Sequence, residues 1–188
     1  MVKADVSSLS PKAAEQERIM ALIAEKLEST QSATVMLKQL TGKEIRVTVS
    51  SMVRYEPRVA DLRALGARAD AEFYSRTSRL LVSGSCVSTA KTIVNLDAVP
   101  KRLREPLLGG KRPIGTVFSK ADFSRQSTGN GVRRLLKTTK SIEDWDTQII
   151  AAHAILLGPD PFAIVEEYYH ASLVYLTKDW KNWVKKHK

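Results

Sequence analysis

The stretch FYSRTSRLLVSGSCVSTAKTIVNL, residues 73–96, decides the fold. Its first part, 73–83, is apolar toward its end, and its second part, 87–96, is rich in threonine and valine. Both compositions are typical of β-strands. Gly84 and Ser85 lie between the two parts and are common turn residues. The stretch therefore predicts a hairpin of two antiparallel strands.

A second hairpin is predicted near the end of the chain. Residues 147–157 and 162–169 are apolar runs of strand length. The segment Gly158-Pro159-Asp160-Pro161 separates them and consists of strong turn formers. Two such hairpins require an antiparallel sheet.

The other segments predict helices, one further strand and loops. A helix is expected to begin at Ser10 and Pro11 and to carry Ile19, Leu22, Ile23 and Leu27 on one face, and a second helix at 32–40 is expected to end near Gly42. Residues 43–52 predict a strand in which Ile45, Val47 and Val49 alternate with polar residues. Further along the chain we expect a loop at 54–71, a short helix at 100–108, a new segment at 116–123 and a flexible turn at Gly129–Gly131. Helices combined with strands paired by hairpins predict an α+β fold, an antiparallel sheet flanked by helices. We expect one domain over 1–188, with an N-terminal helix within 1–30 and a basic C-terminal extension at 177–188.

Composition limits the compartment and the class of protein. The chain has 188 residues, a formal net charge of +10 and one cysteine, Cys86. A single cysteine excludes an internal disulfide and any zinc site with two thiolates. No apolar run reaches the roughly 18 residues of a membrane span, and the first residues lack the apolar core of a secretory signal. We therefore expect a cytoplasmic protein with an anionic partner.

The basic residues concentrate between 95 and 140. This stretch holds eleven Lys and Arg against three Asp and Glu. Such an excess is typical of nucleic-acid contact, but also of a solvated surface or of steering toward a small dianion. Only Phe118 and Phe123 supply aromatic rings there, which is few for a platform that stacks bases. Nucleic acid is therefore the less favoured partner. Trp180 and Trp183 in the lysine-rich tail indicate either a short helix docked on the body or a membrane-surface or partner contact.

Motifs for metal and nucleotide chemistry are missing from the sequence. His153, His170 and His187 show no helical i, i+4 spacing, and there is no HExxH. Gly109-Gly110-Lys111 lacks the remaining residues of a phosphate loop, and no GxGxxG or GxSxG occurs. We expect no metal and no cofactor.

Charged residues inside two of the predicted strands point to a polar interior. Arg76 and Arg79 lie in the first strand, and Glu166 and Glu167 lie in the last. Because side chains alternate between faces, one glutamate must share a face with apolar neighbours. The set predicts either a structural Arg–Glu pair or a pocket in which an arginine binds a carboxylate and a glutamate moves a proton.

At these strands the sequence resembles the chorismate lyase family, whose members convert chorismate into 4-hydroxybenzoate and pyruvate. The matching pieces are Ser32–Gly42 with Lys43 and Ile45–Val49, Arg76–Gly84 with Ala90–Val94 and Pro100, Arg112–Phe118, and Leu156–Tyr169. No piece is specific alone, but four occur in the family's order and spacing. A more distant resemblance is to the ligand-binding domain of certain bacterial transcription regulators.

The resemblance implies an antiparallel sheet with an internal ligand pocket, a small anionic substrate and no cofactor. Arg76 then matches the arginine that binds the ring carboxylate, and Glu167 the glutamate near the ring hydroxyl. The further substrate-binding positions are Arg79 as second choice, Ala90 at the pocket wall, Lys91 as a second cation, Ile114, and Glu166 as the alternative glutamate. The implied activity is the loss of pyruvate from chorismate by a carbon–oxygen lyase.

The sequence also departs from the family. An arginine-rich run before the last hairpin is replaced by Ile150–Ala154, and the tail beyond Tyr175 is extra. The alternatives are therefore a related enzyme that acts on another aromatic acid, and a non-catalytic module that binds an aromatic acid or nucleic acid. The sequence leaves the oligomeric state open.

Overall fold

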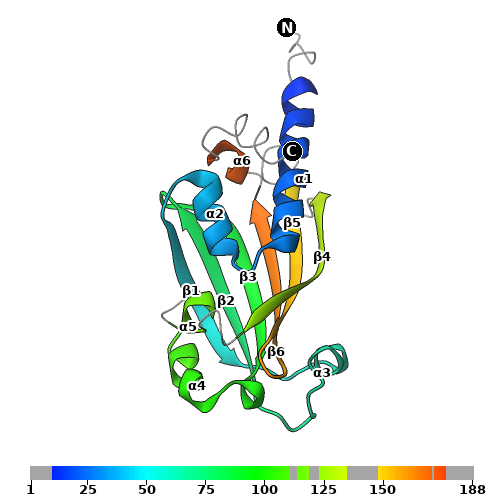
Figure 1. Ribbon diagram of the computed structural model, residues 1–188, viewed down its shortest axis with the longest axis vertical. Helices are drawn as coiled ribbons and strands as arrows, with labels where there is room; N and C mark the ends of the chain where they lie inside the picture. Colours follow the sequence, from blue (N-terminus) through cyan, green and yellow to red (C-terminus); the bar gives the residue numbers. More distant parts are fainter. Residues whose placement is uncertain (1–9, 111–113, 119–122, 135–147, 171, 177–188) are drawn as a thin grey trace, which may run out of the picture.

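A computed structural model describes residues 10–110, 114–118, 123–134, 148–170 and 172–176 (Figure 1). In chain order its elements are α1 (Ser10–Ser29), α2 (Ala33–Thr41), β1 (Ile45–Arg54), α3 (Val59–Leu65), β2 (Phe73–Val82), β3 (Ser85–Asn95), the 3-10 helix η2 (Leu96–Ala98), α4 (Lys101–Leu108), α5 (Ile114–Val117), β4 (Ser124–Arg134), β5 (Gln148–Leu157), β6 (Pro161–His170) and α6 (Ser172–Leu176). The α+β prediction is confirmed.

The described strands form one six-stranded sheet in the order β1-β2-β3-β6-β5-β4. Every neighbouring pair is antiparallel. Both predicted hairpins, β2–β3 and β5–β6, are present, and the pairing of β3 with β6 joins them at the centre. The first turn lies one residue earlier than predicted, at Ser83 and Gly84, with φ values of 49° and 85°. Glycine suits this left-handed conformation because it has no Cβ.

Helices cover one side of the sheet, which we call the inner face (Figure 1). Toward one end of the strands α1 and α2 pack on it, and toward the other end α4 and α5 do. The opposite side, the outer face, is covered at one end by the segment that contains α3, through Leu65, Phe73 and Ile93. The inner face is therefore where buried side chains of the sheet meet the helices.

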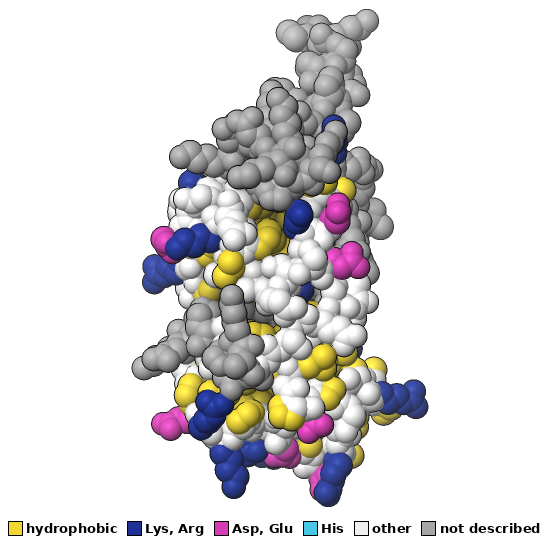
Figure 2. Space-filling view, viewed as in Figure 1, with side chains coloured by type: hydrophobic (Ala, Val, Ile, Leu, Met, Phe, Trp, Pro, Cys, Tyr) yellow, Lys and Arg dark blue, Asp and Glu magenta, His cyan; other side chains and the backbone are white. Residues whose placement is uncertain are grey.

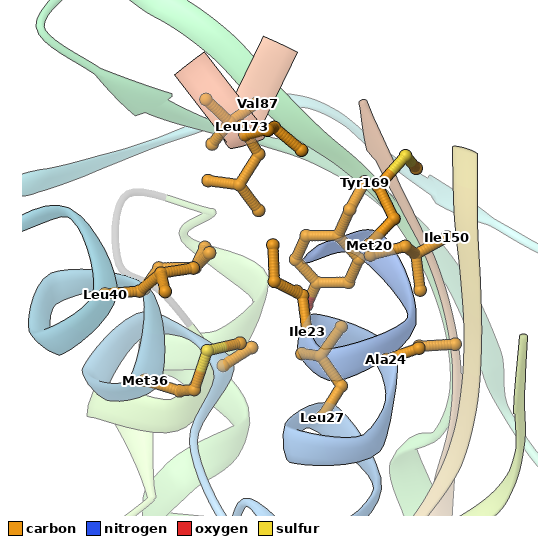
Figure 3. Packing of buried hydrophobic residues seen from close by; sticks show 14 of the residues in the cluster. Met20, Ile23, Ala24, Leu27, Met36, Leu40, Val87, Ile150, Tyr169 and Leu173 are labelled. Atoms are coloured by element: carbon orange, nitrogen blue, oxygen red, sulfur yellow. The ribbon is translucent and has the colours of Figure 1, made fainter. Parts of the chain in front are cut away.

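Residues close together in the sequence explain the two ends of α2 and the buried face of α1. The Oγ of Ser32 accepts a hydrogen bond from the N–H of Val35 and so caps α2. Gly42 ends that helix with φ 65°, as predicted. The periodic residues of α1 include Ile23 and Leu27, which are fully buried. Figure 3 shows Ile23 beside the ring of Tyr169 from β6, with Leu27 about one turn further along α1.

The prediction of a loop over 54–71 is wrong in its centre, where α3 forms. Asp61 in the first turn of α3 accepts hydrogen bonds from the backbone N–H of Arg58 at 2.9 Å and from its guanidinium at 2.9 and 3.0 Å. The hydroxyl of Tyr55 donates to the same carboxylate at 2.8 Å. This capping of a short helix was hidden because the apolar residues of the segment are too few to show a helical period.

The predicted turn at Gly129–Gly131 is also wrong, because these residues belong to β4. A register shift between Ser127 and Gly129 marks an irregularity in the pairing with β5. The backbone of Gly129 has φ 157°. The strand was missed because its sequence, SRQSTGNGVRR, contains only one apolar residue other than glycine.

Other predictions lie partly outside the described residues. The helix at 100–108 is confirmed as α4. Only the beginning and end of the segment at 116–123 are described, and the tail from 177 lies outside the described residues. Within the described part of the chain, no helix is long and apolar enough to cross a membrane.

Candidate functional site

Arg76 lies on the inner face at the centre of the sheet. It pairs with Thr92 of β3, which pairs with Val165 of β6, which in turn pairs with Ala154 of β5. These four residues therefore form one row across the inner face. The Arg76 residue is only 2% exposed. Burial lowers the pKa of its guanidinium, because a low-dielectric environment disfavours the charged form.

Glu167 lies on the same face, in the next row. It pairs with Ala90 and Ala152, and Ala90 pairs with Ser78. Because β3 lies between the strands of Arg76 and Glu167, these two strands are roughly 10 Å apart. Ala90 and Ala152, which flank Glu167 in this row, have small side chains and are buried.

The partner of Glu167 is an arginine that the sequence did not single out. Nη2 of Arg125 in β4 donates to Oε2 of Glu167 at 3.0 Å, and the two side chains are only 5% and 12% exposed. Nη1 of Arg125 donates to the backbone carbonyl of Leu27 at 2.9 Å. That carbonyl belongs to the last turn of α1, where helix carbonyls lack intrahelical partners and attract cations. One guanidinium thus joins the end of α1 to the inner face.

Gln31, between α1 and α2, adds a further connection to β4. Its Oε1 accepts a hydrogen bond from the backbone N–H of Arg125 at 2.9 Å. Its Nε2 approaches the Arg125 carbonyl at 3.5 Å, which is a weak contact. In the sequence Arg125 is one of the eleven basic residues of the stretch 95–140, where only its charge was considered. No signal in the sequence links it to Glu167 or to Gln31.

A small pocket lies beside the Arg125–Glu167 pair. Its volume is about 70 Å³. It is lined by residues of the α1–α2 connection and α2, by α5, by the start of β4 and the end of β5, and by the middle of β6: Gln31, Ser32, Ala33, Thr34, Ile114, Gly115, Phe123, Arg125, Leu156, Val165 and Glu167. Its apolar walls and convergent polar groups are like those of small-molecule sites, but its volume is well below the roughly 300 Å³ at which such sites begin.

Two polar side chains near this pocket are fully buried. Ser88 and Tyr169 pair across β3 and β6 on the inner face, and both are 0% exposed. Within the described part of the chain neither hydroxyl makes a hydrogen bond of good geometry, although that of Tyr169 approaches Glu167 closely enough for a weak one. The pKa of Tyr169 is raised well above its usual range, first by burial and then by the negative charge of Glu167. The inner face therefore holds more polar groups than its described contacts satisfy.

The remaining predicted site residues divide between the two faces. Ala90 lies beside Glu167, and Ile114 lines the pocket from α5. Arg79, Lys91 and Glu166 lie on the outer face, because each alternates with an inner-face neighbour. Lys91 does not join Arg76 as a second cation; its Nζ lies 5.6 Å from the centroid of the Tyr55 ring.

A larger hollow lies at the end of the sheet near α3. Its volume is about 490 Å³, and it is bounded by residues 65–71, by η2 and by the β5–β6 turn. Arg68 and Asp70 at its rim form an exposed ion pair. The guanidinium of Arg68 lowers the pKa of the Asp70 carboxyl. These charges neutralise each other and face solvent. The rim of this hollow therefore resembles a ligand site less than does the small pocket beside Arg125 and Glu167, which we call the inner-face pocket.

The other reactive side chains do not gather. Among the described residues no group of three or more His, Cys, Asp or Glu could hold a metal ion. Cys86 is partly buried, and its Sγ contacts the carbonyl of Ser88 at 3.5 Å. Burial lowers the pKa of His170. In the view of Figure 2, Lys and Arg are interspersed with Asp and Glu at the end that holds α3 and α4. That mixture differs from the one-signed surface typical of nucleic-acid binding.

No family model matches this chain, and no curated protein matches it. Solved structures do. PhnF from Mycobacterium smegmatis matches with a TM-score of 0.58 and 13% identity, over 76% of this chain and 64% of PhnF. The effector domain of the same protein matches with a TM-score of 0.55 and 13% identity, over 74% of this chain and 88% of the domain.

A further match is the ligand-binding domain of a protein from Bordetella bronchiseptica assigned to the GntR family of transcriptional regulators. Its TM-score is 0.49 and its identity 12%, over 66% of this chain and 84% of that one. The chain thus spans less than two thirds of full-length PhnF but most of the isolated domains. The shared feature is the fold.

The prediction that this chain is a carbon–oxygen lyase is wrong. A solved structure with this fold is named an effector domain. In addition Glu167, the predicted acid–base residue, is engaged by Arg125. The part of the resemblance that holds is architectural: the chain has the chorismate lyase-like fold that effector-binding domains share.

Proposed function

We propose that this chain is a non-catalytic domain that binds a small polar ligand in the inner-face pocket. The observation that carries the proposal is the Arg125–Glu167 pair, 5% and 12% exposed, at a pocket lined by Gln31, Ser32 and α5. Buried ion pairs are a weak source of stability, because desolvation offsets much of the attraction. A pair placed at a pocket instead gives the directional contacts by which a ligand is recognised.

The likeness to a structure named an effector domain supports this function over catalysis. Arg76 enters the proposal as the residue that binds an acidic group of the ligand from the neighbouring row, with Ala90 and Ile114 as walls. Val165 connects the two, since it lines the pocket and shares the row of Arg76. Arg79, Lys91 and Glu166 point to the outer face and are assigned no part in ligand binding.

Ligand binding is testable by thermal unfolding of the whole chain against a panel of small acids, including 4-hydroxybenzoate, together with polyols and zwitterions. A ligand that binds only the folded state raises the melting temperature with its concentration. Gly115→Leu is the blocking variant. Gly115 lines the pocket, has no left-handed backbone, and a Cβ at this position meets no atom within 4 Å. The leucine side chain is expected to occupy the pocket and abolish the shift while the fold persists.

Val59→Leu is the control, because it adds a methylene to an exposed side chain of α3, which does not line the pocket. The role of Arg76 is tested separately by Arg76→Gln against Arg79→Gln. These residues lie three apart on β2 but face opposite sides of the sheet. Only the Arg76 variant should weaken binding. A panel without any stabilising compound, or a shift that Gly115→Leu leaves intact, would contradict the proposal.

A further inference from the structure

The hollow near α3 carries a charge opposite to that of the whole chain. Its lining holds three carboxylates, those of Asp70, Asp97 and Asp160, against one guanidinium, that of Arg68. The chain as a whole has a formal net charge of +10. The volume of the hollow, about 490 Å³, lies in the range of small-molecule sites, which begin at roughly 300 Å³. The hollow therefore has the size of a ligand site and a charge that attracts cations.

The ion pair at the rim neutralises only one of the three carboxylates. The guanidinium at the rim donates to both oxygens of Asp70, at 2.9 and 2.6 Å. Oδ2 of Asp97 accepts a hydrogen bond from the backbone N–H of Glu72 at 3.2 Å, and the guanidinium of Arg104 donates to the Asp97 backbone carbonyl at 3.1 Å. Neither Asp97 nor Asp160 forms an ion pair with a residue in the described part of the chain. Two carboxylates at the hollow are thus free to bind a positively charged ligand.

A buried amide lies beside these carboxylates. Asn95, at the end of β3, is 6% exposed and lines the hollow. Its Oδ1 accepts a hydrogen bond from the backbone N–H of Asp97 at 3.2 Å and so caps η2. Its Nδ2 carries two N–H donors and makes no hydrogen bond with any residue that the structure describes. These donors are not enclosed by protein atoms, so they open toward the hollow, where an acceptor atom of a ligand gives them a partner.

We infer that this hollow is a second binding site, distinct from the inner-face pocket, and that it takes a small organic cation with a hydrogen-bond acceptor, such as an amino alcohol. Asp97 and Asp160 bind the ammonium group, and Nδ2 of Asn95 donates to the acceptor. Leu65 and Ala98, which also line the hollow, contact the carbon chain between these two groups. A metal ion fits less well, because no group of three or more His, Cys, Asp or Glu among the described residues could hold one.

Three compounds with the same number of heavy atoms test the inference: 4-aminobutan-1-ol, pentylamine and butane-1,4-diol. Pentylamine lacks the acceptor, and the diol lacks the positive charge. Binding to the whole chain is followed by NMR, through the backbone amides of Gly66 and Asp97 and the side-chain amide of Asn95, at low ionic strength because salt screens exposed carboxylates. The amino alcohol should bind at least about threefold more tightly than either other compound, the value of one hydrogen bond or one exposed ion pair.

The double variant Asp97→Asn/Asp160→Asn should bind the amino alcohol at least about fivefold more weakly, because both carboxylates lose their charge. Glu25→Gln/Glu28→Gln is the matched control. It removes the same charge from two exposed positions of α1 that do not line the hollow, and it should keep the wild-type affinity. Equal weakening in the two double variants would overturn the inference.

The wild-type chain alone can also overturn it. Equal affinities for the three compounds, or no binding of the amino alcohol, would do so even if a variant does not fold. Gly115→Leu should leave the binding of the amino alcohol unchanged, because Gly115 lines the inner-face pocket and not this hollow. Loss of binding in that variant would place the amino alcohol in the inner-face pocket instead and contradict a second site.

Discussion

Two buried carboxylates in this molecule are bound by arginines in opposite ways. Asp61 takes its partner from three residues before it, at the start of α3. Glu167 takes its partner, Arg125, from 42 residues before it, on the far side of β5 in the sheet. Arg58 is 64% exposed, whereas Arg125 is 5% exposed.

The difference separates an ion pair that caps a helix locally from an ion pair that lines a pocket. Water screens the exposed guanidinium of the Arg58–Asp61 pair, and the contacts of this pair stabilise only one short helix, α3. The Arg125–Glu167 pair has lost most of its solvation and joins α1, β4 and β6 at a pocket. Because desolvation offsets much of the attraction in such a pair, stability is a weak explanation for it, and ligand recognition is the role that we propose.

The largest expected effect on stability comes from removing one partner of the Arg125–Glu167 pair, which we call the inner pair. Arg125→Met leaves Glu167 as an uncompensated buried charge and leaves the Leu27 carbonyl without its donor. We expect a loss of about 3–5 kcal/mol in the free energy of unfolding. Urea denaturation followed by circular dichroism measures it.

The double variant Arg125→Met/Glu167→Met sharpens this prediction. Replacing both charges by apolar side chains removes the unpaired carboxylate, so the double variant should be more stable than Arg125→Met alone. If it is equally or less stable, the inner pair is not the source of the penalty.

Breaking the Arg58–Asp61 pair should have a smaller effect on stability, and this effect should depend on pH. Hydrogen bonds from Arg58, the largest cause, lower the pKa of Asp61 from 3.8 to about 2. Because the folded-state pKa is below the unfolded one, the contribution is complete above about pH 4 and is lost as the pH falls toward 2. Asp61→Asn should cost about 1–2 kcal/mol at pH 7, reduced by the exposure of Arg58.

Unfolding curves of the wild-type protein and Asp61→Asn between pH 2 and 7 test this. Their difference should shrink below pH 4. A constant difference over that range would assign the effect to shape or packing instead of charge. Asp160→Asn, an exposed carboxylate in the β5–β6 turn, is the control and should show little change.

Tyr169→Phe should leave stability nearly unchanged. The ring is fully buried against α1 (Figure 3), but among the described residues its hydroxyl makes at most a weak hydrogen bond, to Glu167. Removing a hydroxyl whose hydrogen bond is not made in the folded state should change the free energy of unfolding by less than about 1 kcal/mol. A loss of 2 kcal/mol or more in chemical denaturation would reveal a contact of this hydroxyl.

The smallest effect is expected at the exposed pair Lys38–Glu44, whose side chains are 57% and 84% exposed. Glu44→Gln should change stability by less than about 0.5 kcal/mol, and less at high salt. Equilibrium denaturation at low and high ionic strength measures this. A cost as large as that at Asp61 would show that exposure does not set the value of ion pairs in this protein.

Much of the fold followed from patterns that are local in sequence. The hairpins β2–β3 and β5–β6, the apolar stripe of α1, and the capped helix α2 all depend on neighbours within a few residues. Elements without such a pattern were missed. Strand β4 has almost no apolar side chains, and α3 is held by one carboxylate rather than by an apolar stripe.

The site was predictable only in part. Alternation placed Arg76 and Arg79 on opposite faces and required one glutamate of the last strand to face inward, and the register selects Glu167 for that position. The sequence also allowed an Arg–Glu pair, but it did not indicate Arg125. The expected enzyme was wrong because a shared fold and a few shared residues do not specify a reaction.

The sequence by itself determined the α+β class, the antiparallel hairpins and the presence of charged residues within strands, because each depends on side-chain periodicity and turn residues. Only the tertiary structure decided which charges meet. Strand order brings β4 to the edge beside β5, and there Arg125 reaches Glu167 and the end of α1. Contacts between residues so far apart in the chain depend on the register and packing of the whole sheet, which no local pattern records.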